Sequence, residues 1–134
     1  VFCKIASGII PAKIVLDTPD CCAFLDVNPL APGHILLIPK RHVESMLDAP
    51  ADLIVPLCRQ LPSLVRAIKI STGATGLNVL QNTGASSGQA VFHLHFHLIP
   101  RVAGDGLGYR WNAGTYQAGQ AQAISSGIIA ALKE

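Results

Sequence analysis

The stretch that decides the fold runs from Gln89 to Pro100 and reads Gln-Ala-Val-Phe-His-Leu-His-Phe-His-Leu-Ile-Pro. Three histidines take alternate positions in it: His93, His95 and His97. On an extended strand such positions share one face, at about 6.6 Å per step. The residues between and after them, which face the other way, are apolar enough for a core: Leu94, Phe96 and Leu98. The pattern predicts a strand that holds three imidazoles in a row, and such a row indicates a functional site.

Composition limits what the rest of the chain can be. The chain has 134 residues, half of them hydrophobic, which fits a single domain over residues 1–134 with one substantial core. Its net charge is only +2, and the charged residues are scattered, so the basic stripe typical of nucleic-acid binding is missing. Pro, Gly and charged residues interrupt every apolar stretch well short of a membrane span, and the first residues of the given sequence do not show the charged and then apolar pattern of a signal peptide. We expect a cytoplasmic protein that binds neither nucleic acid nor membrane.

The cysteines agree with that location. There are four: Cys3, Cys21, Cys22 and Cys58. Adjacent cysteines rarely bridge each other, so the spacing favours reduced thiols over a disulfide framework. No two of them have the two-residue spacing of a zinc knuckle, and buried apolar side chains are the ordinary interpretation.

The N-terminal half predicts strands. Residues 14–16 and 22–25 are apolar and β-prone, and Asp17-Thr18-Pro19-Asp20 between them favours a turn, so a hairpin is expected. A loop over residues 28–33 leads to a continuous apolar run at residues 34–38 that Pro39 stops. That run is predicted to be a central strand.

The middle of the chain predicts a long helix. Leucine and isoleucine recur every three or four residues from 52 to 72, and Gly73 would end the helix. Pro56 is tolerable in a first turn, whereas Pro62 predicts a kink.

Two further elements are expected towards the C-terminus. Residues 77–81 alternate as a strand, and a small-residue loop, 83–88, would join them to the histidine strand as a hairpin. Residues 103–108 predict a flexible loop, and residues 117–133 a second helix. The class is therefore α+β: a mainly antiparallel sheet of about five strands, one long helix and a shorter C-terminal helix.

Two chemistries compete for a row of histidines. Imidazoles one residue apart on a strand are a common metal-ligand pair, and a third ligand would complete an open zinc site. The loop before the row favours the other interpretation, because its small residues let backbone amides approach an anion such as phosphate.

The segment His93-Leu94-His95-Phe96-His97-Leu98-Ile99 resembles the signature of the histidine triad (HIT) family of nucleotide hydrolases and transferases, in particular its bacterial Hint-like branch. The resemblance extends over most of the chain up to about Val102. It includes these segments: Phe2-Cys3-Lys4-Ile5, Ile10-Pro11-Ala12-Lys13, Ala23-Phe24-Leu25-Asp26, Pro32-Gly33-His34, Ile38-Pro39-Lys40-Arg41-His42 and Gly88-Gln89.

The resemblance implies a covalent mechanism. His95 would attack the α-phosphorus of a nucleotide derivative, and water would hydrolyse the nucleotidyl-histidine. His97 would donate to a phosphate oxygen, His93 would orient the row, and Gln89 with backbone amides around Gly88 would hold the phosphate. No cofactor would be required for catalysis.

The resemblance also implies a nucleoside pocket. Asp26 would bind both ribose hydroxyls, and Asn82 would lie near the phosphate or ribose. An apolar slot for the base would be formed by Phe2, Phe24, Leu25 and Val27. Core packing for these residues, a turn-capping role for Asp26 and an ordinary buried histidine at His34 are the alternatives.

Two features of the sequence bear on which family properties this chain shares: the residue after Gln89, and the residues that correspond to a zinc site. The phosphoramidate-cleaving branch usually has Ser or Thr after the Gln, whose hydroxyl can help to protonate a departing amine, whereas this chain has Ala90. Many bacterial relatives bind a structural zinc, and the corresponding residues here are Cys3, His42 and His93, with the fourth ligand position falling just before Val1.

The predicted function is therefore a hydrolase acting at the α-phosphate of a purine nucleotide, first of all a purine nucleoside phosphoramidase. The alternatives are a dinucleoside polyphosphate hydrolase, a zinc-dependent hydrolase and a nucleotide-binding regulatory module with little turnover. The resemblance also implies a homodimer, in which the C-terminal segment with Tyr109, Trp111 and Tyr116 would contribute to the partner's active site.

Overall fold

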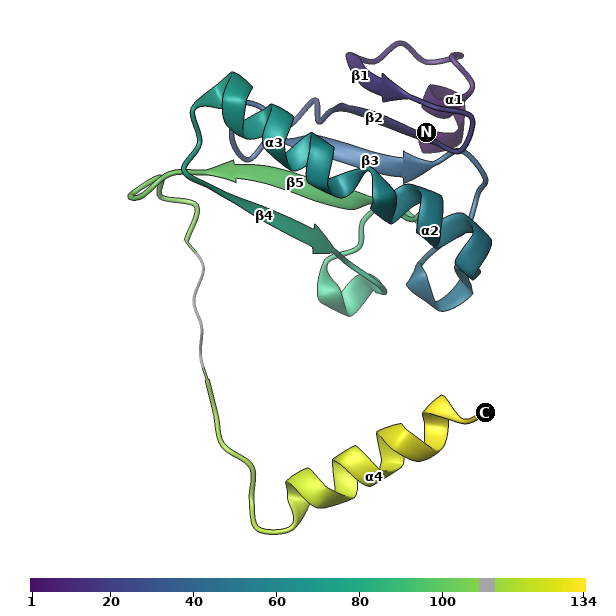
Figure 1. Ribbon diagram of the computed structural model, residues 1–134, viewed down its shortest axis with the longest axis vertical. Helices are drawn as coiled ribbons and strands as arrows, with labels where there is room; N and C mark the ends of the chain where they lie inside the picture. Colours follow the sequence, from purple (N-terminus) through teal and green to yellow (C-terminus); the bar gives the residue numbers. More distant parts are fainter. Residues whose placement is uncertain (109–112) are drawn as a thin grey trace.

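The computed structural model describes residues 1–108 and 113–134. Its centre is a five-stranded antiparallel sheet in the order β1-β2-β3-β5-β4 (Figure 1). The strands are β1 (Ile14–Asp17), β2 (Cys21–Leu25), β3 (Ile35–Pro39), β4 (Gly76–Gln81) and β5 (Phe96–Arg101). The α-helices are α1 (Phe2–Ala6), α2 (Ala51–Arg59), α3 (Leu61–Thr72) and α4 (Gln120–Leu132), with short 3₁₀ turns η1 (Met46–Asp48) and η2 (Ala85–Ser87). The predicted α+β class and antiparallel sheet are confirmed.

The strand order places the apolar run of β3 in the middle, as predicted. β3 pairs with β2 on one side and β5 on the other, and β1 and β2 form the expected hairpin. Thr18 closes that hairpin, because its hydroxyl oxygen accepts from the amide of Cys21 at 3.0 Å. β4 and β5 pair over six residues, from Gly76 opposite Arg101 to Gln81 opposite Phe96.

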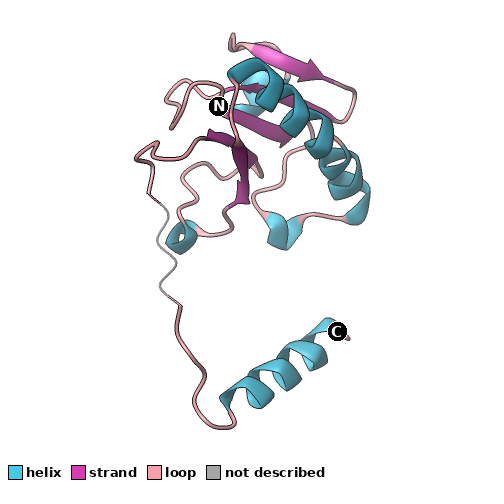
Figure 2. Cartoon of the chain, turned by 60° about the vertical axis from the view of Figure 1, so that its left-hand side comes forward, coloured by secondary structure: helices cyan, strands magenta, loops and turns pink. Residues whose placement is uncertain are grey.

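The two faces of the sheet carry separate cores. Alternate residues of β3 point to opposite faces, so Leu37 joins the core under α2 and α3, whereas Leu36 and Ile38 join the core under α1. Leu94, Phe96 and Leu98 all lie in the core under α2 and α3. Figure 2 shows these helices lying along one face of the sheet. The face left to the histidines is the one that α1 partly covers.

The predicted long helix is bent into two. α2 ends at Arg59 and α3 begins at Leu61, with Gln60 as the junction. Pro62 therefore sits at the start of α3, where a missing amide hydrogen costs no intrahelical bond, instead of kinking a continuous helix. Pro56 lies in the second turn of α2, and not in the first. Gly73 ends α3 in the left-handed conformation, at φ 73°.

The histidine row is only partly a strand. β5 begins at Phe96, so His97 lies in the ladder while His93 and His95 precede it. The backbone there is held from outside the sheet, because the amide of Leu94 donates to the carbonyl of Val43 at 2.7 Å. The prediction that one strand carries all three imidazoles is therefore wrong, since only His97 lies in β5. The three side chains contact different parts of the molecule.

The C-terminal helix α4 lies apart from the sheet and its helices, on the side of β4 (Figures 1 and 2). None of its residues is buried. Within the described residues, no helix is long and apolar enough to cross a membrane.

Candidate active site

A cavity of about 490 Å³ opens on the α1 side of the sheet. That volume lies in the range of small-molecule sites. Its walls come from α1 and the loop after it, from the end of β2 and the loop after that strand, and from the loop that leads into β5. It brings together these predicted residues: Phe2, Phe24, Leu25, Asp26, Val27, Gly88, His95 and His97. We call this cavity the pocket.

His95 presents one bare ring nitrogen. Its Nδ1 lies 2.7 Å from the backbone carbonyl of His93. A carbonyl can only accept, so Nδ1 carries the proton and Nε2 keeps its lone pair. His95 is 6% exposed and lines the pocket, and its ring meets that of Phe2 in a T-shaped contact with 5.1 Å between the centroids. The bond to His93 therefore selects the Nδ1–H tautomer of the neutral ring, whose free Nε2 faces no hydrogen-bond donor among the described residues and is the nitrogen that a nucleophile would use.

A hydrogen-bond chain fixes the opposite tautomer at His97. The amide of Leu30 donates to Nδ1 of His34 at 3.1 Å, so the proton of neutral His34 is on Nε2. That Nε2 donates to Nδ1 of His97 at 2.9 Å, which leaves the proton of His97 on its own Nε2. Since the rings of His95 and His97 pack edge to face with centroids 4.9 Å apart, the row offers an acceptor next to a donor.

Burial favours the neutral forms of His97 and His34. It lowers the pKa of His97 to about 4, with further lowering by the neighbouring His95 and His34. Burial likewise lowers the pKa of His34, against a smaller opposing effect of Asp26. His97 can therefore act near neutral pH as a hydrogen-bond donor without carrying a charge.

Asp26 lies at the mouth of the pocket. One carboxylate oxygen accepts from the amide of Asn28 at 2.9 Å, and the other is 3.7 Å from Nε2 of His34. The bond to Asn28 is the turn-capping interaction considered as an alternative, and it leaves the second oxygen for a ligand. The predicted binding role and the capping role are thus compatible.

The loop before β5 is built differently from the prediction. The side chain of Gln89 is buried, and its Oε1 accepts from the amide of Gly84 at 2.8 Å. Its Nε2 donates to the carbonyls of Glu44 at 2.7 Å and Val91 at 3.0 Å. Both amide hydrogens are committed, and Gln89 is not among the pocket residues. In this structure Gln89 braces the loop, and its direct contact with phosphate stays a prediction.

The backbone amide that is left to bind an anion is that of Ala90, and not those of Gly88 and Gln89. Gly88, at φ 105°, donates its amide to Ala85, and the amide of Gln89 donates to Gly84. The amide of Ala90 has no hydrogen-bond partner among the residues that the structure describes, and Ala90 lines the pocket. Asn82 does not line it but lies behind Gly88, whose missing Cβ would be 3.4 Å from the Asn82 amide nitrogen.

The apolar wall includes residues that the sequence analysis did not single out for the site. Ile10, Pro11, Ala12 and Val91 line the pocket beside Phe2 and Phe24. The short helix α1 was not predicted either, because five residues are too few to show a helical period. It packs Phe2 and Ile5 against β2 and β3 and so forms one wall.

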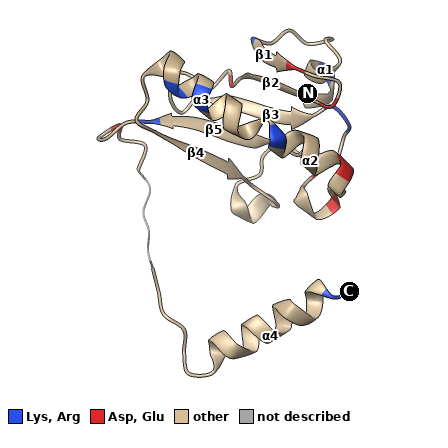
Figure 3. Ribbon diagram, in the orientation of Figure 1, with Lys and Arg blue, Asp and Glu red and all other residues tan. Residues whose placement is uncertain are grey.

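The pocket is poor in charge. Asp26 is the one ionisable carboxylate among its described lining residues, and no lysine or arginine of the described chain lines it. Figure 3 shows the basic and acidic residues scattered over the molecule instead of gathered into a stripe. A bound phosphate would depend on hydrogen bonds from His97 and backbone amides.

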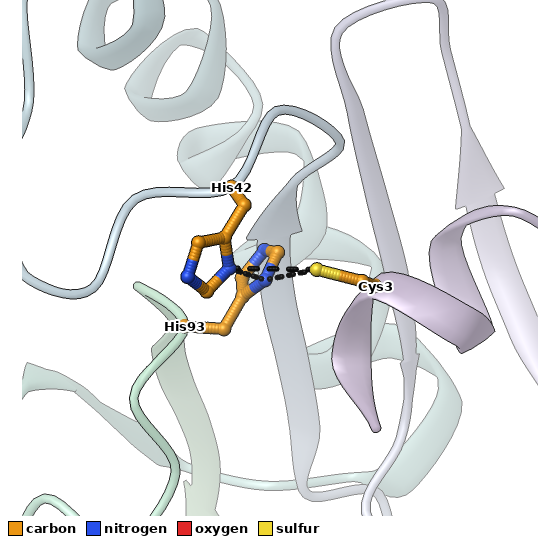
Figure 4. Close-up of side chains that lie close together, drawn as sticks. All are labelled: Cys3, His42 and His93. Atoms are coloured by element: carbon orange, nitrogen blue, oxygen red, sulfur yellow. Dashed lines mark hydrogen bonds between the residues drawn. The ribbon is translucent and has the colours of Figure 1, made fainter.

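His93 points to a second site outside the pocket. Its Nε2 donates to the carbonyl of Pro39 at 2.8 Å, so its Nδ1 keeps a lone pair. That Nδ1 lies 3.3 Å from Sγ of Cys3 and 3.0 Å from Nδ1 of His42, and Cys3 and His42 are 3.4 Å apart (Figure 4). The three candidate ligand atoms converge as zinc ligands would, with the second ring nitrogen of His93 held by a carbonyl.

The fold and the site together define the class of this protein: it is a small α+β domain whose antiparallel sheet carries histidines into a mainly apolar pocket. The model of the HIT domain family matches residues 7–104. The chain belongs to the HIT domain family, as the resemblance implied.

Among curated relatives, the chain is 40% identical to Protein hit of Bacillus subtilis over 96% of this chain and 90% of that protein. It is 38% identical to the adenosine 5'-monophosphoramidase HNT1 of Candida albicans, over 84% of this chain and 78% of that one. It is also 40% identical to the adenylylsulfatase HINT3 of Arabidopsis thaliana, over 80% of this chain and 54% of that protein.

Solved structures share the whole architecture. A crystal structure from Streptococcus mutans superposes with a TM-score of 0.94, covering 98% of this chain and 84% of that one at 35% identity. A zinc-bound histidine triad family protein from Mycobacterium smegmatis superposes with a TM-score of 0.76, covering 97% and 95% at 31% identity.

Proposed function

We propose that the chain is a nucleotide hydrolase that cleaves purine nucleoside phosphoramidates at the α-phosphate, with His95 as the nucleophile. The observation that carries this proposal is the bare Nε2 of His95 in the pocket, beside the Nε2–H of neutral His97. Relatives named as adenosine 5'-monophosphoramidase and adenylylsulfatase, both hydrolases, support the reaction class.

The geometry supports a two-step displacement. The lone pair of His95 Nε2 forms a bond to phosphorus while the bond to the leaving group breaks, and that group departs with its electron pair. The proton on Nδ1 stays in its bond to the His93 carbonyl, which stabilises the positive charge that develops on the ring. Nε2–H of His97 and the amide of Ala90 would donate to the non-bridging oxygens. Water then attacks phosphorus, and the P–N bond breaks to regenerate His95.

The nucleoside would lie against the apolar wall. Phe2, Phe24, Leu25 and Val27 would enclose the base, and Asp26 would accept from the ribose hydroxyls. Because the pocket volume of about 490 Å³ suits a small ligand, a single nucleotide would fit it, and we expect any second group bound to the α-phosphate to extend outwards.

One observation favours a second candidate, a dinucleoside polyphosphate hydrolase. Ala90 supplies no hydroxyl where a departing amine would need a proton, and no serine, threonine or tyrosine of the described chain lines the pocket. A phosphate leaving group is stable as an anion and needs no such donor. A regulatory binding module is less well supported, since binding alone does not require a nucleophile.

The test is the steady-state rate on an adenosine phosphoramidate and on a diadenosine polyphosphate, measured side by side. We expect faster turnover of the phosphoramidate, abolished in His95→Asn, and a further rise for that substrate alone in Ala90→Ser. Preference for the dinucleotide would establish the second candidate. Unchanged nucleotide binding with no turnover of either substrate would leave a binding module.

We also propose that Cys3, His42 and His93 hold a structural zinc. Their donor atoms are 3.0 to 3.4 Å apart, close to the edges of about 3.4 Å in a tetrahedral site, and two imidazoles with one thiolate are a set that zinc prefers. The metal would tie α1 to the loop after β3. The zinc-bound relative supports this assignment.

Zinc analysis of the purified protein tests the site. We expect one zinc per chain, its loss in His42→Ala, and a lower melting temperature after chelation while turnover persists. A metal-free protein whose melting temperature is unaffected by added zinc would contradict the structural role. Loss of all turnover on chelation, with the fold intact, would instead point to a zinc-dependent hydrolase.

A homodimer and a cytoplasmic location stay predictions. β4 is an edge strand of the sheet, and Val79 and Leu80 on it are partly exposed. Such an edge can pair with a second copy, extending the sheet as the family resemblance implies. Tyr109 and Trp111, expected near the partner's site, lie outside the described residues, and Tyr116 is exposed.

A further inference from the structure

The wall of the pocket that α1 forms cannot hold its own shape. The helix α1 spans only five residues, and no side chain caps its N-terminus. A helix of this length is not stable by itself, because forming the first turn fixes several residues for a single hydrogen bond. Contacts with the rest of the protein therefore determine whether this wall of the pocket is ordered.

Polar contacts between this segment and the rest of the protein are made at one residue. Among the residues that the structure describes, the backbone hydrogen bonds of residues 1–10 all end within that segment. The polar atom that reaches outside it is Sγ of Cys3, which lies 3.4 Å from Nδ1 of His42 and 3.3 Å from Nδ1 of His93 (Figure 4). Apolar packing against β2 and β3 is the other attachment of α1. The position of α1 thus depends on an apolar contact and on this cluster.

The residue next to Cys3 reaches the reactive end of the pocket. The ring of Phe2 makes T-shaped contacts with His95, at 5.1 Å between centroids, and with Phe24, at 5.7 Å. Because Phe2 and Cys3 are adjacent on one short helix, whatever fixes Cys3 also fixes the ring that packs on the proposed nucleophile.

His93 makes a second connection between the cluster and the pocket. Its backbone carbonyl accepts from Nδ1 of His95 at 2.7 Å, while its own ring is the one that meets Cys3 and His42. The pocket and the cluster therefore share both α1 and the backbone that leads into β5.

We propose that Cys3, His42 and His93 form a regulatory zinc site, whose occupancy orders α1 and thereby sets the affinity of the pocket for a nucleotide. This goes beyond the structural role proposed above. In the zinc-free protein α1 is held by apolar packing alone, so a ligand that contacts Phe2 bears the cost of ordering the helix. Such coupling is reciprocal, and a bound nucleotide raises the affinity for zinc by the same factor. The inference rests on the proposed function only in that the pocket binds a nucleotide, whether or not the protein hydrolyses it.

Calorimetric titration of adenosine 5'-monophosphate (AMP) into the zinc-loaded and the zinc-free protein tests the coupling. We expect zinc removal to raise the dissociation constant for AMP at least about fivefold, and AMP to lower the dissociation constant for zinc by the same factor. His42→Ala, which removes a ligand outside the pocket, should bind AMP as the zinc-free protein does and should not respond to added zinc. Arg41→Ala is the matched control: its side chain contacts Asp52 on α2, so it should keep the full response.

Phe2→Ala separates the route through α1 from a general effect of zinc on stability. This variant should still bind zinc, because Cys3 and the two histidines remain. It should bind AMP more weakly in both states, and the ratio of the two dissociation constants should fall close to one. A ratio kept at the native value would overturn α1 as the coupling element.

Hydrogen exchange locates the effect in the chain. We expect the amides of residues 5–10 to lose protection when zinc is removed and to regain part of it with AMP, while β3 and β5 stay protected. Loss of protection throughout the sheet would overturn a local device, and so would an affinity for AMP that is equal, or undetectable, in both states. Zinc-dependent binding of AMP by a protein that turns over no substrate would support the coupling and contradict the proposed catalytic function.

Discussion

Backbone carbonyls and amides decide which nitrogen each histidine of the site leaves free. His95 and His93 each donate one ring N–H to a carbonyl, and His34 accepts from an amide. The three imidazoles of the row thereby differ: His95 has the free Nε2 of the proposed nucleophile, His93 has a free Nδ1 at the candidate metal site, and His97, which accepts from His34, has an Nε2–H donor. Identical side chains acquire different chemistry from the peptide groups beside them.

The link from His34 to His97 can be tested with a graded pair of substitutions. His97→Phe removes the donor itself and should lower kcat about 100- to 1,000-fold, as the loss of one oxyanion donor does elsewhere. His34→Leu leaves that donor in place without its partner, so it should lower kcat less and change KM little. His34→Gln, whose amide can both accept from Leu30 and donate to His97, should restore most of the rate. Equal losses in the Leu and Gln variants would show that His34 only fills space.

For single residues, the sequence predicts the side chains that line the pocket better than the hydrogen bonds that hold the surrounding loop in place. The alternation of His93, His95 and His97 identified the row, and the family resemblance indicated Asp26 and the apolar slot. The bracing role of Gln89 could not be predicted, because its partner at Glu44 is 45 residues away and is a backbone carbonyl. The amide of Ala90 could not be distinguished from its neighbours without the turn at Gly88.

At the scale of helices and strands, the spacing of apolar residues predicted which elements exist better than where each one begins and ends. The apolar repeat over residues 52–72 does mark helical structure, but it continues without a break through Gln60, where α2 ends and α3 begins. In the same way, alternation from His93 to Leu98 is kept while the ladder starts only at Phe96, because an outside partner, Val43, holds the preceding backbone. Boundaries depend on such tertiary contacts.

Gly33 is the turn residue on which the β3 side of the site depends. Its φ is +99°, and a Cβ there would lie 2.6 Å from the Thr72 methyl group. Gly33→Ala should therefore destabilise the protein by about 1–3 kcal/mol in urea unfolding. Gly76→Ala is the matched control, since a Cβ in that strand position meets nothing within 4 Å and should cost less than about 0.5 kcal/mol. A neutral Gly33→Ala would mean that the turn can rearrange.

For the whole molecule, the buried imidazoles make stability depend on pH. His97 has a pKa of about 4 when folded and 6.5 in its ordinary state, so the unfolded chain binds more protons between these values. Its contribution to the free energy of unfolding is therefore complete above about pH 7 and falls as the pH drops from 6.5 towards 4. Burial of His34 acts in the same direction.

Urea unfolding at pH 7.0, 6.0 and 5.0 measures this dependence, before most carboxylates titrate. We expect the native protein to lose stability over that range and His97→Gln to lose less. If the two proteins showed the same slope, His97 would not be held neutral by burial.

The covalent step is the centre of the account, and trapping it is the most direct measurement. The protein is mixed with an adenosine phosphoramidate, quenched during turnover in alkaline denaturant that preserves N–P bonds, and examined by mass spectrometry. We predict one adenylyl group on the peptide that contains His95, absent from His95→Asn and accumulating as fast as the first turnover. Turnover without that adduct, or undiminished turnover by His95→Asn, would contradict His95 as the nucleophile.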